Sequence, residues 1–190
     1  MDDLLKFTLI NKLKSVYRSN HVQERHESSA EHTWSTMMLA DYFLEKIKHQ
    51  LNRQRVLELL LYHDLVEIEA GDLSLEDEEA RKKKQKTELA AAKKLRKELP
   101  RELGEKFWDC FVEFEEQMTS EAKFAKAMDI IDAQLHEIDY KEDWEGWTRA
   151  FLERRNTEEN RDAALNEFPE IAAAFTDILD WLEQEGYFSQ

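Results

Sequence analysis

Glycine and proline are scarce in this chain, with 4 and 2 among its 190 residues. Because tight turns depend on these two residue types, their scarcity excludes a fold of many short strands and favours long helices. Hydrophobic residues make up 42% of the sequence, which is enough for a buried core and argues against disorder. No repeat and no linker divides the chain, so we expect one all-α domain over residues 1–190.

Cysteine and long apolar runs are also lacking. The only cysteine, Cys110, excludes an internal disulfide bond and fits a reducing compartment, and we interpret it as a small buried apolar residue. No stretch approaches the roughly 20 apolar residues that a membrane-spanning helix needs. The acidic start, Met1 to Asp3, is not followed by the apolar segment of a signal peptide. We therefore expect a cytoplasmic protein with no membrane partner.

The formal charge of −15 speaks against a nucleic-acid partner, whose phosphates would be repelled. It does not exclude a small anionic substrate, because a metal ion and a few basic side chains can reverse the local field. One basic stretch, residues 81–97, has nine lysine and arginine residues against one glutamate. Two interpretations stay open: a solvated helix face, which is the more common case, or a surface that attracts anionic substrate.

Apolar residues recur at helical spacing along most of the chain. The periodicity predicts helices at 3–17, from a cap at Ser28 or Ser29 to about Ile47, and at 53–66, 101–118, 120–140, 158–167 and 170–186. Residues 53–66 are apolar on nearly every side, which is typical of a central helix. Residues 18–28 are polar and aperiodic, and we expect a loop there.

The dipeptide His63-Asp64 lies at the end of this central segment. A buried carboxylate is costly unless it is paired or bound to a cation. Imidazole nitrogen with carboxylate oxygen is a ligand combination that divalent transition metals accept. The dipeptide alone is a weak signal, because a hydrogen-bonded core histidine beside a helix-end aspartate explains it more often.

Two further residues strengthen the metal interpretation. His32 is expected in the first turn of an earlier helix, and Asp129 stands beside Met128 in the apolar stripe of residues 120–140. Two histidines and two aspartates from three helices would half-surround an ion. The remaining coordination positions would stay open for water and substrate, as catalytic metal sites require.

Several charged residues could assist such a site. Glu67 follows Asp64 by three positions, on the same helix face, and could move protons; the alternative is a solvent-facing glutamate. Asp72 follows Gly71 and could equally be a turn residue. Three basic residues are candidate phosphate contacts, although surface positions are the more common case for such side chains: Arg18, Arg25 and Lys126.

The order His32, His63-Asp64, Asp129 resembles the H…HD…D pattern of the HD superfamily. Three longer segments resemble the subgroup of HD-domain 5'-deoxynucleotidases and HD domain-containing nucleotidases: RHESSAEHTW at 25–34, YHDLVEIEAGD at 62–72 and FEEQMTSEAKFAKAMD at 114–129. The similarity is strongest over residues 5–140. Residues 141–190 are expected to form C-terminal helices that complete the core or a dimer interface.

The resemblance implies an all-helical HD-domain bundle that forms a homodimer and hydrolyses (deoxy)nucleoside 5'-monophosphates to nucleoside and phosphate. It implies one divalent metal ion per chain (Mn, Co, Fe, Zn, Ni or Mg) with the ligands His32, His63, Asp64 and Asp129. Two alternatives stay open. One is a phosphohydrolase of nucleoside triphosphates or cyclic nucleotides, and the other is a non-catalytic nucleotide-binding HD module.

The resemblance also implies roles around the metal. Glu67 would transfer protons, Asp72 would place the attacking water, and Arg18 would engage the phosphate or sugar of the substrate. Lys126 matches a lysine that the family has three positions before the last ligand. Members that prefer deoxyribose carry a tryptophan where this chain has Ser19, so we expect weaker discrimination against a ribose 2'-hydroxyl.

Overall fold

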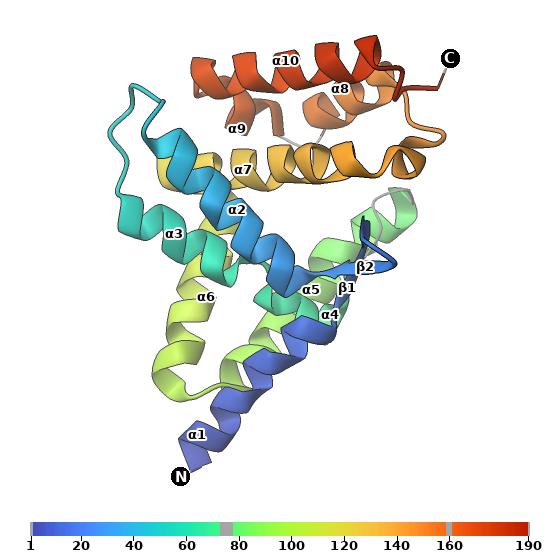
Figure 1. Ribbon diagram of the computed structural model, residues 1–190. Helices are drawn as coiled ribbons and strands as arrows, with labels where there is room; N and C mark the ends of the chain where they lie inside the picture. Colours follow the sequence, from blue (N-terminus) through green and yellow to red (C-terminus); the bar gives the residue numbers. More distant parts are fainter. Residues whose placement is uncertain (1, 73–77, 159–160, 190) are drawn as a thin grey trace. The chain divides into compact units, whose positions relative to one another are not determined.

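The computed structural model describes residues 2–72, 78–158 and 161–189. The chain is mainly helical, with one two-stranded antiparallel sheet (Figure 1), which confirms the predicted fold class. It contains two compact units: one comprises the residues up to Trp34 together with Glu58–Glu116, and the other comprises Ser35–Leu57 and Gln117–Gln190. Among the described helices, none is both long and apolar enough to cross a membrane.

The first unit carries most of the predicted site residues. Its elements are α1 (Asp2–Phe7), η1 (Thr8–Ser15), β1 (Tyr17–Val22), β2 (Arg25–Ser28), the start of α2 (Ser29–Leu44), the end of α3 (Arg53–Tyr62), η2 (His63–Val66), α4 (Glu67–Ala70), α5 (Glu78–Glu98) and α6 (Arg101–Glu116). The 3₁₀ turn η2 and helix α4 pack against α5, and η2 also contacts α6. The predicted central segment is confirmed in part: Leu59, Leu60 and Leu65 are buried, whereas Leu61 is exposed and the α-helix ends at Tyr62.

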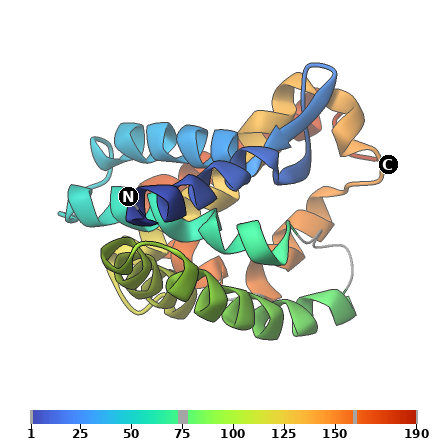
Figure 2. The same cartoon turned by 90° about the horizontal axis from the view of Figure 1, so that it is seen from below.

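Helices α5 and α6 form a helical hairpin (Figure 1 and Figure 2). Gly104 allows α6 to approach α5 closely, because a Cβ atom at this position would lie 2.2 Å from the carbonyl oxygen of Arg96. The basic stretch 81–97 lies in α5, although the side chains of residues 81–85 lie outside those described. Lys86, Lys93 and Lys97 are exposed, in keeping with a solvated helix face.

The expected loop at residues 18–28 is wrong, because these residues form the hairpin β1–β2. The predicted helix at 3–17 is confirmed only in part, since it becomes a 3₁₀ helix at Thr8 and ends at Ser15. The hairpin shows no apolar alternation because the residues buried on it, such as Asn20 and Glu27, are themselves polar. A periodicity argument looks for buried apolar residues and therefore does not detect such strands.

The second unit contains the remaining parts of α2 and α3, followed by α7 (Ser120–His136), η3 (Glu137–Asp139), η4 (Lys141–Trp144), α8 (Arg149–Glu158), α9 (Arg161–Asn166) and α10 (Pro169–Gln184). Helix α7 packs against α9 and α10 (Figure 1). Its predicted stripe is confirmed in part: Phe124, Met128 and Ile131 are fully buried, but the α-helix ends at His136 and not at residue 140. Helix α8 was not predicted, because its sequence is mostly polar.

Candidate metal and catalytic site

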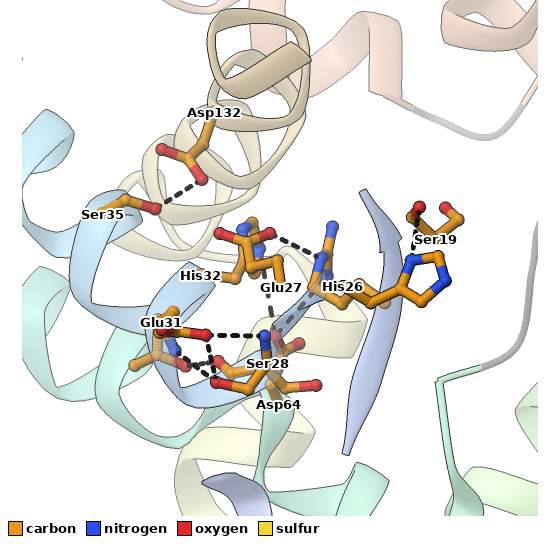
Figure 3. Close-up of polar contacts among 12 residues, drawn as sticks. Ser19, His26, Glu27, Ser28, Glu31, His32, Ser35, Asp64 and Asp132 are labelled. Atoms are coloured by element: carbon orange, nitrogen blue, oxygen red, sulfur yellow. Dashed lines mark hydrogen bonds and ion pairs between the residues drawn. The ribbon is translucent and has the colours of Figure 1, made fainter. Parts of the chain in front are cut away.

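A capping box fixes the start of α2. The Ser28 hydroxyl accepts from the Glu31 amide at 3.3 Å, and the Glu31 carboxylate accepts from the Ser28 amide at 2.9 Å (Figure 3). The hydrogen bond from Arg25, followed by those from Ser28, lowers the pKa of Glu31 to about 2. The helix therefore begins at Ser29 and holds His32 in its first turn, as the sequence predicts.

His63 and Asp64 lie where α3 gives way to the 3₁₀ turn η2. Adjacent residues of a regular α-helix point about 100° apart. In this turn, however, His63 Nε2 lies 3.1 Å from Asp64 Oδ1. Both residues are buried. The change of helix type therefore directs the two side chains to the same place.

The hydrogen bond of the His63 ring defines its tautomer. Nδ1 lies 2.6 Å from the carbonyl oxygen of Leu60, which can only accept, so Nδ1 carries the proton. In a neutral imidazole, Nε2 then presents its lone pair to the Asp64 carboxylate. The Nε2 lone pair and the Asp64 carboxylate oxygen repel each other at 3.1 Å unless a proton or a metal cation binds to them. This is the arrangement that metal-binding histidines adopt.

His32 completes the group within the first unit. Its side chain is fully buried, and Nε2 lies 3.9 Å from Asp64 Oδ2. Each of the two histidines offers a ring nitrogen, and these nitrogens lie within 4.8 Å of each other. Asp64 Oδ2 is buried and accepts no hydrogen bond from any of the described residues. Two imidazole nitrogens and a carboxylate with unused lone pairs fit a divalent transition metal.

Asp129 and Lys126 lie in the second unit, on α7, where the lysine ammonium donates to the Asp129 carboxylate at 2.8 Å. One turn further, Asp132 accepts a hydrogen bond of 2.8 Å from Ser35 (Figure 3). Asp129 is half-buried, as a residue at the margin of the apolar stripe should be. Its ligation of the metal, and contact of Lys126 with a phosphate, stay predictions.

Arg18 lies on β1 and contacts two carboxylates. Its Nη1 is 3.8 Å from Asp64 Oδ2, and its Nε is 3.4 Å from Glu27 Oε2. Only 14% of the Arg18 side chain is exposed, which excludes the surface alternative for this arginine. Glu27 is almost completely buried. Sequence reasoning missed Glu27, because a glutamate in a polar, aperiodic segment gives no signal of burial.

Glu67 is buried at the first position of α4, which excludes the solvent-facing alternative. Burial, followed by the negative charges of Asp64 and Asp72, raises its pKa to about 8. Hydrogen bonding from Ser29, whose hydroxyl lies 2.6 Å from Glu67 Oε2, offsets part of this effect. Without a metal, Glu67 therefore holds a proton at neutral pH. Sequence reasoning considered Ser29 only as a helix cap.

The remaining predicted residues lie on the hairpin or after α4. Asp72 is half-buried and close enough for its charge to act on Glu67. Ser19 is exposed, and its carbonyl oxygen contacts the ring of His26. Arg25 is exposed and bound to Glu31. Substrate contact by Ser19 and Arg25 stays a prediction.

Residues 10–172 match the HD domain family. The 5'-deoxynucleotidase HDDC2 of Xenopus laevis is 33% identical over 143 residues, which cover 73% of this chain and 70% of that protein. The chain belongs to the HD domain family. The human 5'-deoxynucleotidase HDDC2 is 30% identical to this HD-domain protein and covers 73% of it, with 69% of its own length matched.

Solved structures agree with the family assignment. A predicted metal-dependent phosphohydrolase from Magnetospirillum magnetotacticum MS-1 has a TM-score of 0.82 and 28% identity to this HD-domain protein, covering 100% of this chain and 95% of its own. An HD-domain phosphohydrolase from Listeria innocua shares the fold, with a TM-score of 0.68, 20% identity, and coverage of 97% and 90%. The family predicted from His32, His63-Asp64 and Asp129 is confirmed.

Proposed function

We propose that this HD-domain protein is a metal-dependent phosphohydrolase that converts nucleoside 5'-monophosphates, deoxy forms included, to nucleoside and phosphate. The observation that carries the proposal is the convergence of His32, His63 and Asp64, with a protonated, buried Glu67 three residues after Asp64. A binding module would not need a buried proton carrier beside a metal site. The relatives named 5'-deoxynucleotidase support the choice of substrate.

One divalent ion per chain would be held by His32, His63, Asp64 and Asp129. Two imidazoles favour Mn, Co, Fe, Zn or Ni over Mg, which prefers oxygen ligands. When bound, the ion would supply acidification of water and polarisation of a phosphoryl oxygen. Asp64 is suited to bind this ion because its Oδ2 is buried and accepts no hydrogen bond from the described residues.

The other residues of the chain perform binding and proton transfer. Arg18 binds the phosphate and offsets the charge that develops on its oxygens, because the guanidinium already lies 3.8 Å from Asp64. Glu67 donates its proton to the leaving 5'-oxygen of the nucleoside. Asp72 orients the attacking water, and Lys126 contributes a second positive charge.

We also propose that the chain acts as a single HD domain and forms a homodimer in the cytoplasm. Large apolar side chains at a spacing of four residues support the dimer: Trp34, Met38 and Tyr42 on α2 each remain more than half exposed. A second copy covering this row would remove it from water. Sedimentation equilibrium of the wild type and of Met38→Glu measures the assembly state.

Phosphate release from a panel of nucleotides tests the proposed function. Ribo- and deoxyribonucleoside monophosphates, triphosphates and cyclic nucleotides are each incubated with metal-loaded protein. Release from monophosphates, abolished in Asp64→Asn and retained in the exposed control Asp109→Asn, is the expected result. Reaction of triphosphates or cyclic nucleotides alone favours the alternative phosphohydrolase. Nucleotide binding without release, whichever metal is supplied, favours the non-catalytic module.

A further inference from the structure

The hairpin β1–β2 contains an irregularity at the residues that face the site. Tyr17 pairs with Ser28, and His21 pairs with His26. Between these two pairs, β1 has three residues, Arg18 to Asn20, whereas β2 has only Glu27. The excess makes β1 bulge. Bulges of this kind redirect side chains and are frequent beside active sites.

The two strand faces differ sharply in exposure. Asn20 and Glu27 are almost completely buried, and the Arg18 side chain is 14% exposed. Ser19 and His26 are exposed. Arg18 therefore lies on the inner side of the bulge, where its Nη1 is 3.8 Å from Asp64 Oδ2, and Ser19 lies on the outer side.

His26 contacts the bulge from this outer side. Its Nδ1 lies 3.1 Å from the carbonyl oxygen of Ser19 (Figure 3). A carbonyl can only accept, so Nδ1 donates this hydrogen bond and ties the side chain of β2 to the backbone of the bulge. The His21 ring, 4.6 Å away between centroids, packs against the His26 ring and limits its rotation.

Glu27 contacts the bulge from the inner side. It is the single residue of β2 opposite the three bulged residues, and its Oε2 lies 3.4 Å from Arg18 Nε. The Nη1 atom of the same guanidinium lies 3.8 Å from Asp64 Oδ2. Glu27 and Asp64 thus contact different nitrogens of Arg18 and define the orientation of its plane.

We propose that His26 and Glu27 are positioning residues that together aim the Arg18 guanidinium at the substrate phosphate. His26 holds the backbone of the bulge through Ser19, and Glu27 holds the guanidinium itself. This inference rests on the proposed function, since it takes Arg18 as the phosphate contact. It assigns a role to two residues beyond the metal ligands and the proton carrier.

Substitutions of His26 test the backbone part of this proposal. His26→Ala removes the donor, whereas the amide nitrogen of His26→Asn replaces Nδ1. We expect His26→Ala to raise KM for the monophosphate about tenfold or more, because small displacements of a positioning group are costly. In His26→Asn, KM should lie within a few-fold of the wild-type value. In both variants, kcat and metal content should change little. Glu24→Gln, on the exposed turn of the hairpin, is the control.

A double-mutant cycle tests whether both residues act through Arg18. Glu27→Gln keeps the side-chain volume and removes the charge, and it should also raise KM. If His26 and Glu27 act only by aiming the guanidinium, neither substitution should raise KM further in an Arg18→Ala background. Equal effects of His26→Ala and His26→Asn, or effects that add to that of Arg18→Ala, would overturn the proposal.

Hydrogen–deuterium exchange separates this proposal from the proposed function, because it needs no substrate. In wild-type protein, amides of residues 17–22 should exchange slowly. Exchange there should accelerate in His26→Ala and not in His26→Asn or Glu24→Gln. Unchanged exchange in His26→Ala contradicts the bulge support even if the protein hydrolyses monophosphates. If exchange accelerates in His26→Ala but the protein hydrolyses no nucleotide, His26 does hold the bulge and the proposed phosphohydrolase function is wrong.

Discussion

Glu67 combines a buried position with a pKa raised to about 8, and this separates its proposed role from that of the proposed metal ligands. In Glu67→Gln, the amide keeps the size and an acceptor oxygen but carries no acid proton. We expect metal content to be retained while kcat falls by about 10²–10⁴-fold. His63→Ala should lose metal and activity together. Metal per chain and single-turnover rate are measured on the same samples, and loss of metal in Glu67→Gln would make Glu67 a ligand.

The raised pKa of Glu67 also makes the folding stability of the protein depend on pH. A group whose pKa rises on folding, here from 4.5 to about 8, binds its proton more tightly in the folded state. Its stabilisation is therefore complete below the unfolded value and is lost as pH rises through the folded value. In metal-free protein, the Tm of the wild type should fall more than that of Glu67→Gln between about pH 5 and pH 9. Glu115→Gln, on the exposed surface of α6, should follow the wild type.

We expect Ser19 to influence sugar selectivity, because members of the family that prefer deoxyribose carry a tryptophan at this position. A tryptophan at this position could exclude a 2'-hydroxyl by contact, whereas a serine can exchange a hydrogen bond with it. We expect wild-type kcat/KM values for a ribo and deoxyribo pair to differ less than those of Ser19→Trp. A wild-type preference for the deoxy form above about a hundredfold, or roughly 2.7 kcal/mol, would show that selectivity arises elsewhere.

Among the elements, α2 begins at a network that links the hairpin to the helix turn carrying His32, a proposed metal ligand. Glu31 accepts from the Ser28 amide and hydroxyl and from Arg25, and these contacts lower its pKa to about 2. A lowered pKa stabilises the fold above the unfolded value of 4.5, and this contribution is lost as pH falls through about 2. Glu31→Gln should cost up to about 1 kcal/mol at neutral pH, since solvent screens the pair.

Urea titrations of the wild type and Glu31→Gln at several pH values measure this contribution. The difference in unfolding free energy should shrink as pH falls below 4.5. Glu24→Gln is the control, because Glu24 is exposed. Glu45 would not serve, because it forms an ion pair with Arg53. A difference that stays constant down to acid pH would assign the loss to packing and not to the charge of Glu31.

Elements differed in how well the sequence predicted them. Helix α7 was predictable because its buried face is apolar, and the start of α2 was predictable because Ser28 and Glu31 form a local capping pattern. The hairpin was not, because its buried residues are polar and one of its inward-facing residues, Arg18, contacts the distant residue Asp64. The same cause hid Glu27: its burial is compensated by Arg18, which no local pattern reveals.

At the scale of the whole molecule, negative charges repel one another both over the chain, whose formal charge is −15, and within the site. Asp64, Glu27 and Glu67 are all buried in the first unit. Arg18 and the proton of Glu67 offset part of this negative charge, and a divalent cation would offset more. Metal binding should therefore stabilise the folded chain as well as support the reaction.

Chelation measures this stabilisation directly. A ligand that binds only the folded state stabilises it by about 2.7 kcal/mol at a hundredfold excess over its Kd. We expect EDTA to lower the Tm of the wild type by several degrees, and readdition of Mn or Co to restore it. His63→Ala should show neither change, because it lacks one of the two imidazole ligands. Asp129→Ala tests the fourth proposed ligand: a chelator-sensitive Tm equal to that of the wild type would remove Asp129 from the metal site, whereas a smaller shift would support its ligation.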